Sequence, residues 1–146
     1  MSAYNDQIKI LQKMGVQEVV KICKSLLPTE YRHRPYRHPE LNNGISLLQS
    51  EDGMNAYMAA YGEMHIAKCR AALQNFPFDK LKGSIEIIDW GCGQGVGSLC
   101  VLDTLSQRDK LQWIKRVTLI EPSPATLGRA VINVTQATGG SVAVLP

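Results

Sequence analysis

The sequence of 146 residues contains no long hydrophobic run. No window approaches the roughly 18 to 20 consecutive apolar residues that a membrane-spanning helix needs. The first residues, MSAYNDQIKILQKMG, carry charge and lack the apolar core of a signal peptide. We therefore expect no membrane contact and a cytoplasmic location. With 45% hydrophobic and 20% charged residues, the composition is that of a globular chain rather than a disordered one.

The sequence also has little excess charge and no cysteine motif. Sixteen Lys and Arg against thirteen Asp and Glu leave a formal charge of +3, too small to mark a nucleic-acid-binding protein by itself. The cysteines show neither a CxxC spacing nor a flanking pair of histidines, so zinc and thioredoxin-like redox sites have no basis in the sequence. We expect reduced thiols and no metal site. The four cysteines are Cys23, Cys69, Cys92 and Cys100.

The sequence begins with helical patterns followed by a polar connection. Apolar residues, Met14 among them, recur at helical steps between residues 6 and 27. An interruption near Gly15 and an end before Pro28 predict one or two short helices. Residues 31–43 (YRHRPYRHPELNN) hold three arginines and two prolines, which indicates an exposed arm without a regular helix.

Residues 53–75 predict a longer helix rich in alanine and methionine, which Gly62 weakens without ending. Tyr57, Tyr61 and His65 fall on one stripe at four-residue steps. We expect them to pack this helix onto the sheet that follows, and the alternative is that they cover a bound ligand. The expected apolar face of the helix consists of Met54, Met58, Tyr61, Met64, Ala67 and Ala71.

The second half of the sequence alternates strands and helices. A β-branched run at residues 85–88, bounded by glycines, predicts a buried parallel strand that ends at Asp89. A helix follows, and residues 116–121 predict a second strand before Ser123, which can cap a second helix. Residues 142–145 predict a third strand. Two consecutive strand–helix units predict an α/β fold with a parallel sheet, behind an all-helical leader.

Four glycines, Gly91, Gly93, Gly95 and Gly97, alternate directly after the first predicted strand. Glycine permits positive φ and lets a ligand approach bare backbone. The unpaired N–H groups at the start of the next helix favour a negatively charged group. At the end of the second strand, Glu121 offers two acceptor oxygens to which a ribose diol can donate. An anion together with a ribose indicates a nucleoside-bearing cofactor.

The register of the glycines separates two classes of cofactor. A dinucleotide fingerprint needs glycine at its sixth position, which is Val96 counted from Gly91 and Ser98 counted from Gly93. The pattern of an acid followed by three alternating glycines instead matches residues 89–95 (DWGCGQG) without a gap. In this motif the sequence resembles the class I S-adenosylmethionine-dependent methyltransferases.

The resemblance implies a Rossmann-like parallel sheet and S-adenosylmethionine as the cofactor. In that family the glycine loop accepts the methionine part, the leading acid orients its ammonium group, and the acid after the second strand binds the ribose hydroxyls. We expect the side chains of Trp90 and Cys92 to pack rather than to contact a ligand. Cys92 has no neighbouring His or Lys that would make it a nucleophile. The cofactor-binding positions implied are Asp89, Gly91, Cys92, Gly93, Gln94, Gly95, Glu121 and Pro122.

Residues 54–135 are similar to a narrower group, the methyltransferase-like family associated with small-subunit assembly of mitochondrial ribosomes, and its bacterial relatives. The stretches concerned are NAYMAAYGEMHIAKCRAAL, IIDWGCGQGVGSL and LIEPSPATLGRA. This similarity implies an RNA or ribosomal substrate. In the arm, Arg32, Arg34 and Arg37 alternate with aromatic side chains, as in segments that stack on unpaired bases. However, Glu30 and Glu40 flank these arginines and no larger basic field surrounds them, so we expect a short solvated loop, with RNA contact as the alternative.

The family sheet has seven strands, and its fourth strand carries the usual catalytic and substrate-contacting residues. Because residues 84–146 predict about three strands, we expect the N-terminal portion of a methyltransferase, inactive alone and with its catalytic residues unknown. Residues 1–52 form the helical leader and basic arm, and residues 53–146 begin the Rossmann-like domain. In the family the fourth strand lies beside the first, so we expect the free edge of the first strand to favour self-association.

Two other functions stay open. A nicotinamide-type (NAD) dinucleotide-binding domain uses the same order of strand, glycine turn and helix. A non-catalytic methyltransferase-like scaffold or ribosome-assembly protein would keep the fold and contact RNA through the arm. The simplest interpretation is structural, with an ordinary glycine turn that Asp89 caps and with Glu121 as a solvated strand end.

Overall fold

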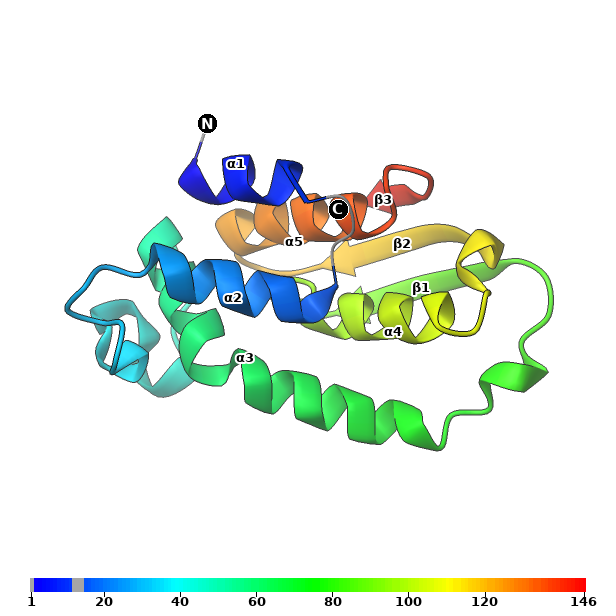
Figure 1. The fold of residues 1–146 in the computed structure, drawn as a ribbon, viewed down its shortest axis with the longest axis horizontal. Helices are drawn as coiled ribbons and strands as arrows, with labels where there is room; N and C mark the ends of the chain where they lie inside the picture. Colours follow the sequence, from blue (N-terminus) through cyan, green and yellow to red (C-terminus); the bar gives the residue numbers. More distant parts are fainter. Residues whose placement is uncertain (1, 12–14) are drawn as a thin grey trace.

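The computed structural model describes residues 2–11 and 15–146. In these residues the chain forms five α-helices and one three-stranded sheet (Figure 1). None of these helices has both the length and the apolar character needed to cross a bilayer. The helices are α1 (Ala3–Lys9), α2 (Val16–Leu26), α3 (Glu51–Gln74), α4 (Val96–Ser106) and α5 (Pro124–Ala137). The strands are β1 (Ile85–Trp90), β2 (Ile114–Ile120) and β3 (Ala143–Leu145).

The sheet is parallel throughout, in the order β1–β2–β3. This confirms the predicted α/β class with a small parallel sheet, and the arrangement is compatible with a Rossmann-like fold. Asp89 pairs with Leu119 and Trp90 with Ile120, so the carboxyl ends of β1 and β2 lie side by side. The chain therefore leaves β1 and β2 at the same edge of the sheet. The first residue after β2 is Glu121.

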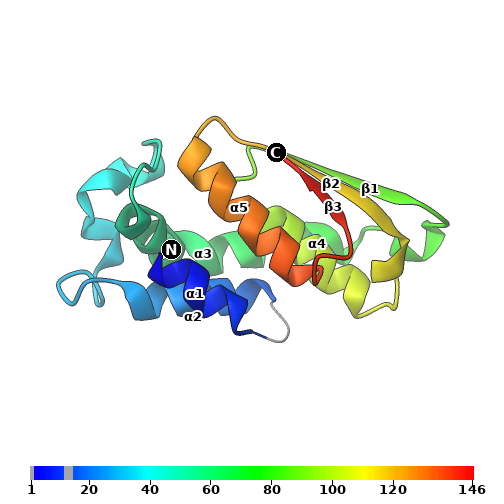
Figure 2. The same cartoon turned by 90° about the horizontal axis from the view of Figure 1, so that it is seen from above.

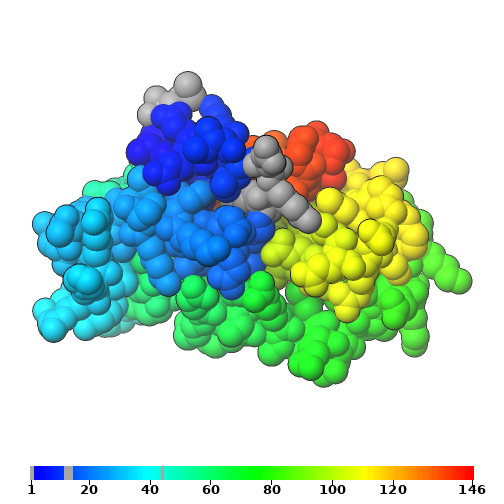
Figure 3. All heavy atoms as spheres, viewed as in Figure 1, coloured from blue at the N-terminus to red at the C-terminus, as the bar shows by residue number. Residues whose placement is uncertain are grey.

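The helices lie on one side of the sheet. Figure 2 shows α4 and α5 next to the sheet and α1 and α2 farther out. On the face shown in Figure 3, α2 lies against both α3 and α4. The buried core is continuous from Tyr4 in α1 and Val19 in α2 to Leu99 in α4 and Val117 in β2. The helical leader therefore shares one core with the strands and helices that follow it.

The sequence predicts one or two short helices in the leader, and the structure has two, separated near Gly15. Gly15 is the extended residue that immediately precedes α2, and α2 ends at Leu26, before Pro28. The first helix begins earlier than the apolar pattern suggests, because the Ser2 side chain accepts a hydrogen bond from the Asn5 N–H and caps α1. Met14, expected on the apolar face, lies outside the described residues.

The arm between α2 and α3 contains no α-helix, as predicted. It folds instead into two 3₁₀ turns, η1 (Pro35–Arg37) and η2 (Pro39–Gly44), each of which starts at a proline. The arm is also tied to the helices, because Leu41 is fully buried against Leu27 and Ala56. Two further 3₁₀ turns, η3 (Phe78–Lys80) and η4 (Leu111–Trp113), precede β1 and β2.

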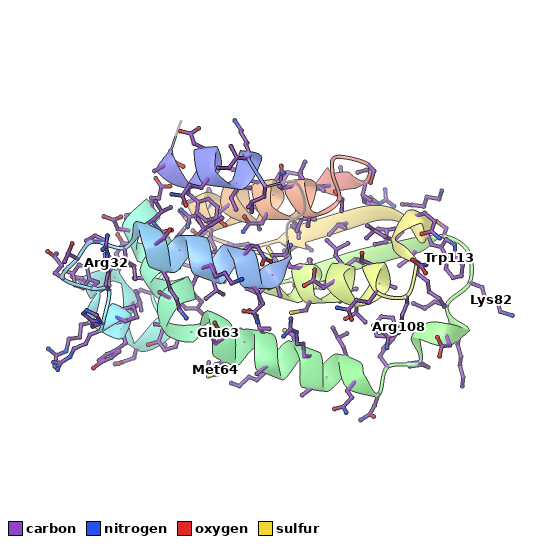
Figure 4. All side chains as sticks on the ribbon, viewed as in Figure 1. Arg32, Glu63, Met64, Lys82, Arg108 and Trp113 are labelled. Atoms are coloured by element: carbon purple, nitrogen blue, oxygen red, sulfur yellow. The ribbon has the colours of Figure 1, made fainter. Side chains whose placement is uncertain are left out.

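The predicted apolar face of α3 is correct at its start and wrong beyond Gly62. Met58 is buried, but Met64 is 44% exposed on the side of α3 that faces away from α2 (Figure 4). A Cβ atom on Gly62 would lie only 2.8 Å from Cγ2 of Val20 in α2. Because α2 packs directly on Gly62, the buried stripe continues through Ile66 instead. The residues that this leaves exposed are Met64, Ala67 and Ala71.

The expectation that β1 is a buried strand is wrong, because one of its faces is half-buried and the other is exposed. Ile88 is 59% exposed and Trp90 is 76% exposed, so the expectation that Trp90 packs is wrong. Successive residues of a strand point to opposite faces, and these two side chains point away from α4 and α5. Among the described residues, no helix covers that face (Figure 2). We call it the uncovered face.

The contact at Gly62 generates a test of the fold. We expect Gly62→Ala to lower the free energy of unfolding, measured by urea denaturation, because the added methyl group forces α2 away from α3. Gly128→Ala is the matched control, since Gly128 is also inside a helix but a Cβ there would meet nothing within 4 Å. The free energy of unfolding of Gly128→Ala should rise by about 0.5–1 kcal/mol, because alanine has a higher helix propensity than glycine.

We expect Gly62→Ala to be less stable than Gly128→Ala by about 1–3 kcal/mol, the usual cost of overpacking. Equal stabilisation by the two substitutions would contradict the close approach of α2 and α3.

Candidate functional site

Residues 91–95, here called the glycine loop, join β1 to α4. Gly91, Gly93 and Gly95 have φ values of 64°, 53° and 84°, which confirms the predicted positive φ. A Cβ on Gly91 or Gly93 would meet nothing within 4 Å, whereas one on Gly95 would lie 3.3 Å from Val134 of α5. The loop therefore presents open backbone at its first two glycines and packs against α5 at the third. The fourth glycine, Gly97, lies within the first turn of α4.

Asp89 caps the start of α4. Its Oδ2 atom accepts hydrogen bonds from the Ser98 N–H (3.0 Å) and the Ser98 hydroxyl (2.7 Å). A Cβ on Gly97 would lie 3.2 Å from the same oxygen, so glycine there lets the carboxylate come close to the helix. The sequence predicts a bound anion at the N-terminus of α4. In the structure the carboxylate of Asp89 occupies that position.

Glu121 joins the glycine loop to the turn before α5. Its Oε2 accepts from the Gly93 N–H (3.0 Å) and its Oε1 from the Ser123 N–H (3.1 Å). It is therefore more than a solvated strand end. A carboxylate has about four lone-pair positions, so each oxygen keeps capacity for one further donor. Pro122, which follows, is exposed and lies outside the two cavities described below.

Gln94 anchors the glycine loop to the helices. Its Nε2 donates to the Met54 carbonyl (2.9 Å), and its Oε1 accepts from Arg129 (3.5 Å). Its own carbonyl accepts from the Asn133 side chain (3.0 Å). Both ends of this buried amide are engaged by protein groups. Its contribution to the site is therefore to hold the loop in place.

Cys92 is buried in the core, as expected for a packing residue. Its N–H donates to the Ile120 carbonyl (3.0 Å), which ties the loop to the end of β2. Burial, and then the nearby charges of Asp89 and Glu121, raise the pKa of the Cys92 thiol to about 12. The thiol is therefore protonated at neutral pH and unsuited to act as a nucleophile.

Two cavities lie against the glycine loop. One has a volume of about 260 Å³ and is lined by Glu121 and by residues 45–48, and we call it the glutamate-side cavity. The other, the aspartate-side cavity, has a volume of about 250 Å³ and is lined by Asp89 and His65. Among the residues that the structure describes, neither lining includes a lysine or an arginine. The residues common to both are Tyr57, Gly91, Gly93 and Gln94.

Tyr57 and His65 line the aspartate-side cavity, and the expectation that their stripe packs α3 onto the sheet is wrong, because α3 packs mainly on α2 and α4. The Tyr57 hydroxyl lies 3.0 Å from Nε2 of His65. Burial, and then the charge of Lys68, lower the pKa of His65, which favours a neutral imidazole at neutral pH. The stripe at four-residue steps marked these residues in the sequence. Residues 45–48, in contrast, belong to no motif in the sequence. They line the glutamate-side cavity because of the course that the chain takes between the arm and α3.

The arginines of the arm line neither cavity at the glycine loop. Arg32 is exposed in the connection between α2 and α3, at one end of the molecule (Figure 4), and its Nε donates to the Leu27 carbonyl (3.1 Å). Arg34 and Arg37 are exposed too. Contact between this arm and RNA stays a prediction.

The structure brings Asp89, Glu121 and the first two loop glycines together at one sheet edge. Comparison of the chain with protein-family models, with curated proteins and with solved structures gave no match. Among residues 2–11 and 15–146, no group of three or more His, Cys, Asp or Glu side chains could hold a metal ion. The chemistry of the site must therefore be inferred from its geometry.

The backbone of the glycine loop can be tested by substitution. Gly91→Ala should lose about 1–2 kcal/mol of unfolding free energy in urea denaturation, because an L-residue is strained at this φ. Gly83→Ala should lose the same amount, since Gly83 also has positive φ (77°) and open space around it, away from the site. A Gly91→Ala protein as stable as the unaltered chain would contradict the left-handed loop.

Proposed function

We propose that this chain binds S-adenosylmethionine and is the N-terminal part of a class I methyltransferase. The observation that carries the proposal is the position of two carboxylates, Asp89 and Glu121, on either side of an open glycine loop. Asp89 lies near the end of β1 and Glu121 directly follows the neighbouring parallel strand β2, at the edge where ligands of open α/β sheets bind.

The functional groups of S-adenosylmethionine suit this arrangement. No hydrogen bond of the described residues uses Oδ1 of Asp89, so this oxygen can accept from the ammonium of the methionine part. The two remaining acceptor positions of Glu121 match a ribose diol. Ligand sites usually measure roughly 300–1,000 Å³. Since each cavity alone is smaller than that, a ligand of this size would occupy both.

The charge of the site favours this cofactor over a dinucleotide. A pyrophosphate is normally held at a helix N-terminus, but Asp89 already occupies the start of α4. Two carboxylates face the cavities, and no lysine or arginine of the described part of the chain lines them. A doubly negative pyrophosphate would be repelled there, whereas an ammonium and a sulfonium would be attracted.

In a complete methyltransferase of this kind, a nitrogen, oxygen or carbon nucleophile attacks the sulfonium methyl group. The carbon–sulfur bond breaks, and S-adenosylhomocysteine leaves with the bonding electron pair. Positioning of the two reactants supplies much of the rate. The residues assigned here bind and orient the cofactor, and the nucleophile and its catalytic residues are left open.

Binding of S-adenosylhomocysteine tests the proposal. We expect titration calorimetry to show saturable binding that Glu121→Gln weakens roughly 10- to 100-fold, the effect of losing hydrogen bonds to a charged group. Glu86→Gln is the control, because Glu86 is an exposed carboxylate of β1 paired with Arg116 on the sheet (2.7 Å). It should leave the dissociation constant unchanged.

The proposal fails if no heat of binding is detected, or if the Glu121 and Glu86 variants bind equally well. Saturable binding of NADH, followed by fluorescence, would favour the dinucleotide alternative instead.

The uncovered face supports the second part of the proposal, that further chain completes the sheet. Ile88 and Trp90 are exposed there, and within residues 2–11 and 15–146 β1 has a strand partner on one side only. An unpaired strand edge beside an apolar surface is a template for association. We therefore propose that residues 1–146 alone associate through this edge.

Light scattering tests this association. The measured mass should exceed 16.1 kDa at high protein concentration, and Trp90→Lys should return it towards that of the monomer. Ile10→Lys is the control, because Ile10 is equally apolar and exposed but follows α1, away from the sheet. A monomeric mass for the unaltered chain at every concentration would count against the proposal.

A further inference from the structure

The ring of Tyr57 stands where the two cavities meet. Tyr57 lines both of them, together with the open glycines of the loop. The hydroxyl group is held by His65 at 3.0 Å, and the two rings are stacked with their planes 15° apart. On the same helix, Tyr61 packs edge-on against Tyr57 with centroids 5.3 Å apart. The ring is therefore fixed in orientation by protein groups before any ligand binds.

Tyr57 shares a cavity wall with each of the two carboxylates. The charge of Glu121 contributes to raising the pKa of Tyr57, after burial and Tyr61, so the phenol stays neutral at physiological pH. On the other side, Tyr57 shares the wall of the aspartate-side cavity with Asp89. A ligand that reaches from one carboxylate to the other must pass beside this ring.

The covalent structure of the proposed cofactor then decides which atom lies there. In S-adenosylmethionine the sulfur joins the amino-acid chain to the 5′ carbon of the ribose. If the ammonium is held by Asp89 and the ribose by Glu121, the sulfur is the atom between them. The inference that follows rests on the proposed function and on this assignment of the two ends.

We infer that Tyr57 forms the wall of the site opposite the sulfonium and distinguishes this cation from the neutral thioether of S-adenosylhomocysteine. The face of an aromatic ring carries negative charge density and attracts a cation, but it has no such attraction for a neutral sulfur. The neighbouring His65, neutral because burial lowers its pKa, adds no opposing charge. Tyr57 is thus a specificity-determining residue for the charge state of the cofactor.

The test compares the two ligands in the same variants. Titration calorimetry with S-adenosylmethionine and with S-adenosylhomocysteine gives a dissociation constant for each. We expect Tyr57→Leu to weaken S-adenosylmethionine binding roughly 2- to 30-fold more than S-adenosylhomocysteine binding, the range of a cation–π contact. Tyr57→Phe keeps the ring and should keep the ratio of the two constants.

Tyr61→Leu is the matched control, because Tyr61 touches Tyr57 but lines neither cavity. It should leave the ratio unchanged even if both affinities fall. Thermal melting reports whether each variant folds. If Tyr57→Leu does not fold, Tyr57→Met replaces it, since methionine fills irregular space without a ring.

Two results would overturn the inference while the proposed function stands. One is an equal loss of affinity for both ligands in Tyr57→Leu, which would make the ring a cover of the site without a charge preference. The other is a change in the ratio of the two dissociation constants that is as large in Tyr57→Phe as in Tyr57→Leu. That result would assign the effect to the hydroxyl group. If the unaltered chain binds neither ligand, the proposed function itself fails.

Discussion

A buried arginine connects most parts of this protein. The side chain of Arg129, in α5, is only 4% exposed. Its guanidinium donates to Asn55 of α3 (2.7 Å), pairs with Glu51 (3.4 Å) and lies 3.8 Å from the centre of the Tyr4 ring in α1. A buried charge is costly unless it is paired and hydrogen-bonded. Arg129 therefore fixes how the leader helices meet the α/β part of the chain.

The same arginine stabilises the site, because it also donates to Gln94 in the glycine loop. Through Gln94 the loop is bonded to α3 and α5, and through Glu121 it is bonded to the end of β2. The open backbone at Gly91 and Gly93 is thus held from several directions at once. A site built in this way is formed before a ligand arrives, which lowers the cost of ordering it on binding.

Local patterns predicted much of the fold. The glycine loop, the cap at Ser123 and the parallel strands were all foreseen, because each depends on residues close together in sequence. The buried side of α3 was not, since it depends on α2 packing against Gly62. Likewise, the exposure of Trp90 follows from which face of the sheet the helices cover, and the strand pattern does not contain that information.

For the site, the sequence by itself determined the order of acid, glycines and second acid, because backbone conformation and strand ends are local properties. Only the tertiary structure decided what surrounds them. It placed Asp89 on the start of α4, tied Glu121 to the loop, and brought Tyr57 and residues 45–48 to the cavity walls. These contacts join residues far apart in the chain, and their positions are set by how the helices pack around a shared core.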